Sequence, residues 1–157
     1  ERSEKIFVRA LGPTSFQVGF VLVYRAEMYT QLRRYSEAQA LYRQGIALLE
    51  KTLGREHFQV ATAVSNLSVI YVHEKRYAEA ERMQRDALTI IEKTVGPEHH
   101  VVAQLLMRHA ALLRLMKRKS EAKSMEGRAA AITAKFQSAN QLSHRVDVSD
   151  LKFEKVH

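Results

Sequence analysis

Three carboxylates are spaced in a way that argues against acid–base catalysis. Glu37, Glu79 and Glu121 recur every 42 residues, so each occupies the same place in a repeating unit. General acid–base catalysis uses an asymmetric pair of groups whose surroundings push their pKa values apart. Three equivalent carboxylates are instead typical of one structural role used three times. We therefore predict that these glutamates are structural, that the chain has no catalytic residue and that it is not an enzyme.

The histidines resemble metal ligands in type, but their spacing predicts that they do not converge. His57 and His99 are also 42 residues apart, and His100 follows the second of them. Equivalent positions on packed helices lie about 10 Å apart, whereas a zinc ion needs its ligands at about 2 Å. The sequence has no cysteine and no glycine-rich phosphate-binding motif. We expect neither a metal nor a cofactor.

A period of 42 residues organises the sequence that carries these side chains. Such a period is the signature of a solenoid, in which each unit packs only on its neighbours. The repeated elements are Leu11-Gly12, Leu53-Gly54 and Val95-Gly96, followed by Tyr35–Ala38, Tyr77–Ala80 and Lys119–Ala122. We predict a solenoid over residues 1–139, with a partial repeat at 1–10, full repeats at 11–52, 53–94 and 95–139, and a tail at 140–157.

Each full repeat predicts two helices joined by a short turn. Long windows without glycine or proline, with apolar residues in a helical spacing, indicate helices that turn one stripe inward. The predicted helices are Phe16–Leu32, Ser36–Lys51, Val60–Glu74, Ala78–Lys93, Val101–Met116 and Ser120–Gln137. The predicted fold class is all-α, with antiparallel helix pairs stacked in series. Because the first residues overlay the second half of a later helix, we also expect further chain before Glu1 in the full protein.

The chain is basic, with a net charge of +8 from 25 Lys and Arg against 17 Asp and Glu. Much of the excess lies in the last repeat, where residues 117–119 occupy a predicted turn between helices. We interpret this cluster as a solvated turn. Aromatic residues that would stack on bases are not interleaved with it, so we do not expect nucleic acid as a partner. An acidic protein partner is compatible with the charge.

The apolar stretches are too short to cross a membrane. The segment Phe16–Tyr24 is among the longest, and it is well below the roughly 18 residues that a spanning helix needs. We predict a soluble protein without a membrane span. Its compartment stays open, with the cytoplasm favoured.

The repeated residues resemble those of a known family. Leu-Gly-x-x-His at Leu53–His57, Leu-Ser-x-x-Tyr at Leu67–Tyr71 and Arg-Tyr-x-Glu-Ala-Glu at Arg76–Glu81 are similar to the tetratricopeptide repeat of the kinesin light chain type. The resemblance covers residues 1–137. It implies a right-handed α-solenoid whose first helices line a concave groove, and it implies a non-enzymatic scaffold that binds a partner protein or peptide there.

The resemblance also implies which residues face the groove. They are positions on the first helix of each repeat that the packing stripe leaves free. The predicted partner-binding residues are Phe20, Val23, Tyr24 and Glu27 in the first repeat, Thr62, Ser65, Asn66 and Val69 in the second, and Gln104, Met107, Arg108, Ala111 and Arg114 in the third. This mixed surface suits an extended peptide with apolar and acidic side chains.

Two other functions stay open at this stage. The apolar ends of the stack are compatible with a module that assembles into a homo-oligomer. The missing start of the first repeat is compatible with a regulatory segment of a larger enzyme. The residue pattern favours the scaffold, because it offers a groove and no catalytic group.

Overall fold

The structure, a computed structural model, describes residues 15–143, and it describes side-chain surroundings for residues 15–139. This part of the chain contains six α-helices and no strand, so the predicted all-α fold is confirmed. The predicted partial repeat 1–10 and residues 144–157 of the predicted tail lie outside the described residues. The helices are α2 (Phe16–Gln31), α3 (Tyr35–Leu53), α4 (Phe58–His73), α5 (Tyr77–Val95), α6 (His100–Leu115) and α7 (Lys119–Ser143).

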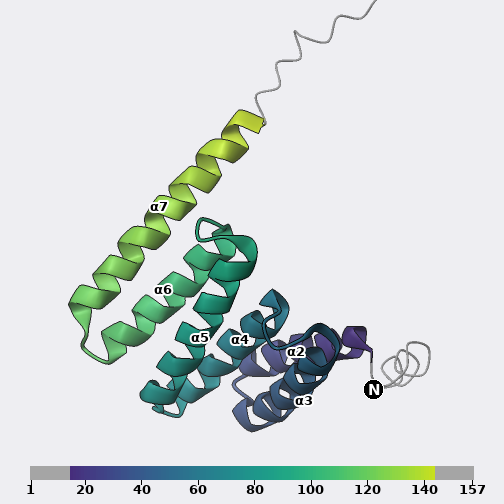
Figure 1. Cartoon of the computed structure of the whole chain (residues 1–157). Helices are drawn as coiled ribbons and strands as arrows, with labels where there is room; N and C mark the ends of the chain where they lie inside the picture. The colour runs from purple at the N-terminus through teal and green to yellow at the C-terminus, as the bar shows by residue number, and fades with distance from the viewer. Residues whose placement is uncertain (1–14, 144–157) are drawn as a thin grey trace, which may run out of the picture.

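The helices form three pairs that stack in series (Figure 1). The closest packing is within the pairs α2 with α3, α4 with α5 and α6 with α7. The second helix of each pair then packs on the first helix of the next, and α2 also contacts α4. Neighbour-only packing of this kind is what defines a solenoid.

Histidine starts two of the three first helices. The Nδ1 atom of His57 accepts a hydrogen bond from the backbone N–H of Gln59, and the Nδ1 atom of His99 accepts one from Val101, each at 3.3 Å. These side chains satisfy helix N–H groups that have no partner inside the helix. The repeated histidines are therefore explained as helix caps. Ser15, which precedes α2, makes no side-chain cap.

The connections between pairs depend on glycine at one position. Gly54 and Gly96 end α3 and α5 with φ angles of 88° and 93°. An L residue with a side chain rarely adopts this left-handed backbone, whereas glycine does so without steric cost. This is why the Leu-Gly and Val-Gly elements recur with the period.

The turn inside each of the three helix pairs contains an equivalent ion pair between an arginine and a glutamate. Arg34 donates to Glu37, Arg76 donates to Glu79 at 2.7 and 2.6 Å, and Arg118 donates to Glu121 at 2.6 Å through each of two nitrogens. These hydrogen bonds are the main cause that lowers the pKa of each of the three glutamates. The structure thus gives all three glutamates the same structural partner.

Small residues allow the two helices of each pair to cross closely. Ala38, Ala80 and Ala122 are each 0% exposed. At the crossing of α2 and α3 the chain uses glycine, since a Cβ added at Gly45 would lie 3.0 Å from the carbonyl oxygen of Gly19. The positions of Gly19 and Gly45 are filled by buried alanines in the second and third repeats. In the first pair, the backbones of α2 and α3 therefore approach each other directly at these two glycines.

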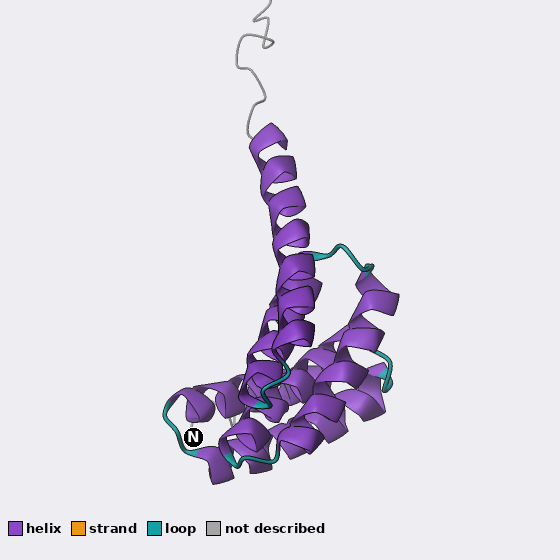
Figure 2. Ribbon diagram, turned by 90° about the vertical axis from the view of Figure 1, so that its left-hand side faces the viewer, coloured by secondary structure: helices purple, strands orange, loops and turns teal. Residues whose placement is uncertain are grey.

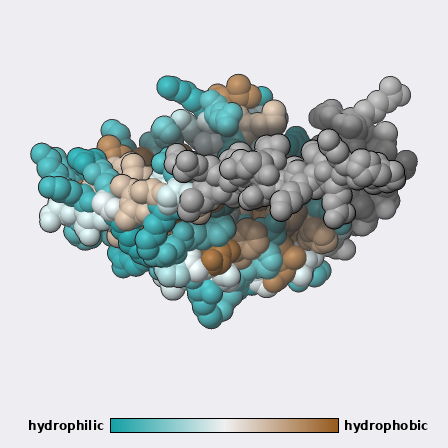
Figure 3. Space-filling model, turned by 90° about the horizontal axis from the view of Figure 1, so that it is seen from above, coloured by the Kyte–Doolittle hydropathy of each residue, from teal (hydrophilic) through white to brown (hydrophobic). Residues whose placement is uncertain are grey.

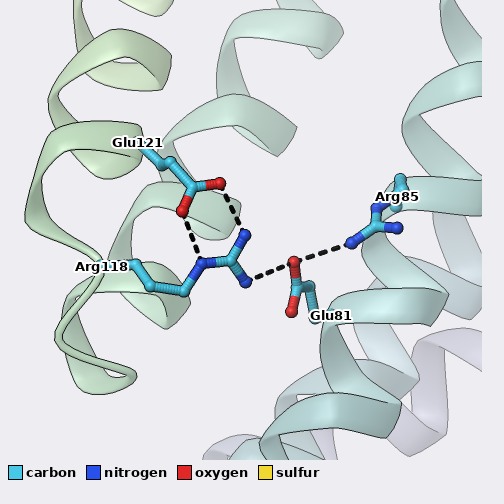
Figure 4. A network of polar contacts seen from close by, with 4 residues as sticks. All are labelled: Glu81, Arg85, Arg118 and Glu121. Carbon is cyan, nitrogen blue, oxygen red and sulfur yellow. Dashed lines mark hydrogen bonds and ion pairs between the residues drawn. The ribbon is translucent and has the colours of Figure 1, made fainter.

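An ion-pair network joins the second and third pairs (Figure 4). Glu81 on α5 is only 7% exposed, and it accepts hydrogen bonds from Arg118 at 2.7 Å and from Arg85 at 2.8 Å. Beside this network His109 on α6 is buried, and its Nδ1 atom has no hydrogen-bond partner. Burial lowers the pKa of His109. The interface between the second and third pairs, called a joint below, therefore has the Glu81 ion pairs at its edge. The buried His109, whose neutral form is favoured, lies beside them.

The last helix is longer than predicted. It ends at Ser143 and not at Gln137, so residues 140–143 of the predicted tail are helical. The missing Leu-Gly turn led to the earlier boundary, but residues 138–143 contain neither glycine nor proline and nothing in their backbone stops a helix. Figure 2 shows the end of α7 projecting beyond the other helices.

The face shown in Figure 3 is mostly hydrophilic where it is coloured. On the face shown in Figure 3, apolar residues form separate areas among hydrophilic ones. Among the described helices, none combines the length and the apolar character needed to cross a membrane.

Candidate concave-groove binding site

A cavity of about 380 Å³ lies between α2, α4 and α6, the first helices of the three pairs. Three equivalent helices side by side explain why residues 42 apart in sequence meet in one place. The cavity is lined by eight of the thirteen predicted groove residues, which are Phe20, Val23, Tyr24, Glu27, Thr62, Asn66, Gln104 and Arg108.

Five predicted groove residues do not line this cavity. Ser65 is fully buried beneath it and reaches it only through a contact with Arg108. Arg114 is bound by Glu126 of α7 through hydrogen bonds of 2.6 and 2.7 Å. Val69, Met107 and Ala111 lie outside the lining, and Met107 is 52% exposed. Their contact with a partner stays a prediction.

The sequence reasoning missed one turn of the groove. Phe58, Gln59 and Val101 line the cavity close to the N-termini of α4 and α6, and Leu49, Ala63 and Leu105 form part of its wall. Phe58 and Gln59 precede the predicted residue Thr62 by one helical turn, on the same side of the helix. Extending the groove positions by one turn toward each helix start would have found them.

Arg108 is the central polar group of the cavity. Its Nη1 atom donates hydrogen bonds to Ser65 Oγ at 2.9 Å and to Asn66 Oδ1 at 2.8 Å. The side chain is partly buried, and burial lowers the pKa of the guanidinium, while Tyr42 and Glu27 act in the opposite direction. Arginine stays charged in proteins even so. In the described part of the chain no carboxylate forms a direct ion pair with it, although Glu27 lines the same cavity and interacts with it electrostatically.

The hydrogen bonds of α4 continue below the cavity floor. Ser68 Oγ donates to the carbonyl oxygen of Ser65 at 2.7 Å and accepts a hydrogen bond from Gln84 Nε2 at 2.9 Å. Ser65 and Ser68 are 0% exposed, and Gln84 is buried on α5. The polar groups around Arg108 thus extend from the groove into the interface of the second pair.

The cavity is apolar toward the helix N-termini and polar further along. Phe20 packs edge to face on Phe16 with ring centroids 6.0 Å apart, and Phe58 lies on the neighbouring helix. About two turns further along, Glu27 and Arg108 line the same cavity. Aromatic surfaces bury large apolar groups well. A bound segment would therefore meet an apolar surface and a charged surface in a fixed order.

Tyr42 lies near the polar part of the cavity. It is 1% exposed, and burial raises the pKa of its phenol to about 12. The phenol is therefore uncharged at neutral pH, so it contributes no negative charge that would neutralise Arg108. Glu27 is the carboxylate that lines the cavity.

The described residues contain no metal-binding group. No cluster of three or more His, Asp or Glu side chains lies close enough together to hold an ion. The arrangement of the cavity fits recognition of a polypeptide by shape, apolar contact and charge.

Three stacked helix pairs with a groove along their first helices define an α-solenoid of the protein-interaction type. The tetratricopeptide repeat family model matches residues 17–92 and 59–135, which together cover most of the chain. The chain belongs to the tetratricopeptide repeat family. Its repeats resemble those of the kinesin light chain type. This family serves generally in protein–protein interaction and is generally non-enzymatic.

Solved structures share the fold. BtubC (BKLC) from P. vanneervenii superimposes with a TM-score of 0.70 at 22% identity, covering 79% of this chain and 50% of that one. A candidate kinesin light chain from Podosopora anserina with nearly identical TPR-like repeats gives 0.66 at 25% identity, covering 74% and 55%. Its Q17M form gives 0.68 at 23% identity, covering 86% and 64%.

The chain therefore spans about half to just under two thirds of the length of these structures. No curated protein matches the sequence.

Proposed function

We propose that this protein is a scaffold that binds a short extended segment of a partner protein in its concave groove, and that the segment carries an acidic group and an apolar side chain. The observation that carries the proposal is Arg108, a partly buried cation in a cavity of about 380 Å³ with no ion-pair partner among the described residues. Removing a charged group from water is costly unless the charge is paired, and an anionic ligand bound directly to the guanidinium lowers that cost.

The size of the cavity supports a short segment. A volume of this order encloses a ligand of small-molecule size, which corresponds to a few side chains of an extended peptide. The remaining contacts would then lie along the open groove, where Tyr24 is 66% and Met107 is 52% exposed. Exposed aromatic and methionine side chains are common at protein-binding surfaces.

The order of chemistry along the groove supports one orientation. An apolar side chain of the partner fits against Phe20 and Phe58, and an acidic side chain fits beside Arg108. Glu27 lies on the opposite helix of the cavity and repels a second carboxylate. The groove should thus prefer one acidic group followed or preceded by apolar residues over a polyacidic segment.

The experiment is a selection of short peptides from a random display library on the whole chain. We expect the selected peptides to share an acidic and an apolar residue. Their affinity for the Arg108→Met variant should fall at least about tenfold, because a charge-assisted hydrogen bond is lost. Arg82→Met is the matched control, since Arg82 is an exposed cation on α5 outside the cavity. Selected peptides that bind the Arg108→Met variant as tightly as wild type would contradict the proposal.

A further inference from the structure

Among the described residues, Arg108 is held through one nitrogen only, and this determines which edge of the guanidinium is available. We infer that Ser65 and Asn66 are positioning residues that fix Nη1 and present the opposite edge, Nε and Nη2, to a ligand carboxylate. This inference rests on the proposed function, because it specifies how the acidic group of the partner is recognised. Ser65 and Asn66 then orient the guanidinium of Arg108 and do not contact the partner themselves.

The geometry of the guanidinium supports a two-point contact. Its Nη1 atom carries two N–H groups, and the structure gives it two acceptors, Ser65 Oγ at 2.9 Å and Asn66 Oδ1 at 2.8 Å. Nε and Nη2 make no hydrogen bond to the described residues. Together they form the planar fork that binds both oxygens of a carboxylate through two parallel hydrogen bonds. The free edge is thus suited to a carboxylate rather than to a single acceptor.

Only the second repeat has the residues that build this support. The position of Ser65 is occupied by Val23 in the first repeat and by Met107 in the third, and the position of Asn66 is occupied by Tyr24 and by Arg108 itself. Ser65 is nevertheless 0% exposed, so a polar side chain stands where the other repeats have an apolar one. Burial of a hydroxyl is unfavourable unless it is hydrogen-bonded. The contact with Arg108 supplies the reason for serine at this position.

Ser68 provides a matched comparison on the same helix. It is also 0% exposed and lies one turn further along α4, but it bonds to the Ser65 carbonyl and to Gln84 and not to Arg108. Ser65→Ala and Ser68→Ala therefore remove the same hydroxyl from the same kind of environment. Only the first should change how Arg108 is oriented.

Asn66→Asp tests the inference in the opposite direction. The side chain keeps its shape, but it places a carboxylate 2.8 Å from Nη1, where Asn66 Oδ1 now lies. The internal ion pair neutralises the cation that a ligand needs. We expect this variant to stay folded and to lose carboxylate binding. Arg108→Lys should also lose it, because an ammonium cannot form the two parallel hydrogen bonds.

The test uses acetate, the simplest carboxylate, on the whole chain labelled with ¹⁵N. The Nε–H resonance of Arg108 should shift as sodium acetate is added at constant ionic strength, in wild type and in Ser68→Ala. Acetate should bind about tenfold more weakly to Ser65→Ala, since one hydrogen bond to the charged group is lost. The shift should be absent in Asn66→Asp. Thermal unfolding of each variant confirms that it is folded.

The outcomes separate this inference from the proposed function. Equal acetate affinity in wild type, Ser65→Ala and Asn66→Asp overturns the assignment of the positioning residues, even where selected peptides still need Arg108. An Arg108-dependent acetate shift without any selected peptide leaves the positioning role in place and overturns the proposed function. An Arg108 Nε–H resonance that does not respond to acetate in wild type overturns the inference directly.

Discussion

Asn66 on α4 accepts a hydrogen bond from Arg108 on α6 at 2.8 Å, and the two residues occupy the same position in successive repeats. The residue at this position in the first repeat is Tyr24 on α2, which lines the same cavity. Stacking thus turns one position of the repeat into a row across the groove. The row combines a phenol, an amide and a guanidinium, so three chemically different groups lie on one repeating framework.

Gly45→Ala should destabilise the protein. The new Cβ would lie 3.0 Å from the Gly19 carbonyl oxygen and 2.9 Å from Val23 Cγ2, and the backbone atom cannot move aside without shifting a helix. Overpacking of this kind costs about 1–3 kcal/mol. The loss is measured as a lower free energy of unfolding in urea.

Gly127→Ala is the matched control for that substitution. Gly127 lies inside α7, and a Cβ added there meets nothing within 4 Å. Alanine should therefore stabilise the helix by about 0.5–1 kcal/mol. Equal effects of the two substitutions would show that the α2 and α3 crossing is not as close as the structure has it.

Ala80→Leu should destabilise the second helix pair. Ala80 is 0% exposed on α5, which packs closely on α4, so a leucine side chain would have to displace buried neighbours. We expect a loss of about 1–3 kcal/mol, seen as a lower melting temperature. Ala78→Leu is the control, because Ala78 is exposed two residues earlier. A melting temperature unchanged by Ala80→Leu would contradict the packing of the pair.

Lys75→Gly should stabilise the protein. Lys75 has a φ of 62°, in the left-handed region where a residue with a side chain is strained by about 1–2 kcal/mol. Glycine relieves this strain, although it is more flexible in the unfolded chain and part of the gain is lost. Calorimetry of Lys75→Gly and of Lys51→Gly, which lies inside α3, should show a rise for the first and a fall for the second. A fall in both would mean that the lysine stabilises the turn.

The stability of the protein should fall as the pH drops from about 7 to 5. Burial is the main cause that lowers the pKa of His109, and Arg85 and Arg118 act in the same direction against Glu81 and Glu121. The folded state therefore favours the neutral imidazole. The stability that neutral His109 contributes is fully present above the unfolded pKa of about 6.5. It is lost as the pH falls from that value through the lower pKa of the folded state.

His109→Leu should remove much of this pH dependence. The equivalent residue in the second repeat is Leu67, which is buried, so leucine suits the position. His73→Gln, on the exposed end of α4, serves as the control. Urea unfolding of the three proteins at several pH values makes the comparison. An unaltered pH profile in His109→Leu would place the titrating group elsewhere.

The sequence allowed the framework to be predicted because the same burial recurs at the same repeat position. Ala38, Ala80 and Ala122 are all 0% exposed, and the three glutamates form the same ion pair. The groove positions came from the family resemblance, and eight of them line the cavity, while their contact with a partner stays a prediction. A period specifies what all repeats share, and the stack needs those shared residues.

The features that differ between repeats were harder to predict. The hydrogen bonds of Arg108 depend on Ser65 and Asn66, two residues that occur in one repeat only, and on a rotamer that no spacing specifies. The end of α7 depends on residues beyond the last repeat, where no period applies. The ion pair of Arg114 with Glu126 was also not predicted, because it depends on how α7 packs on α6 in the same pair.

The stacking of pairs only on their neighbours has a mechanical consequence. Glu27 belongs to the first pair and Arg108 to the third, so the width of the cavity between them is set by two successive joints and by the pair in the middle. A small rotation at each joint adds along the array and opens or narrows the cavity. A segment bound across the cavity would restrict motion at both joints at once. Amide hydrogen exchange of the helices at the two joints should then be slower.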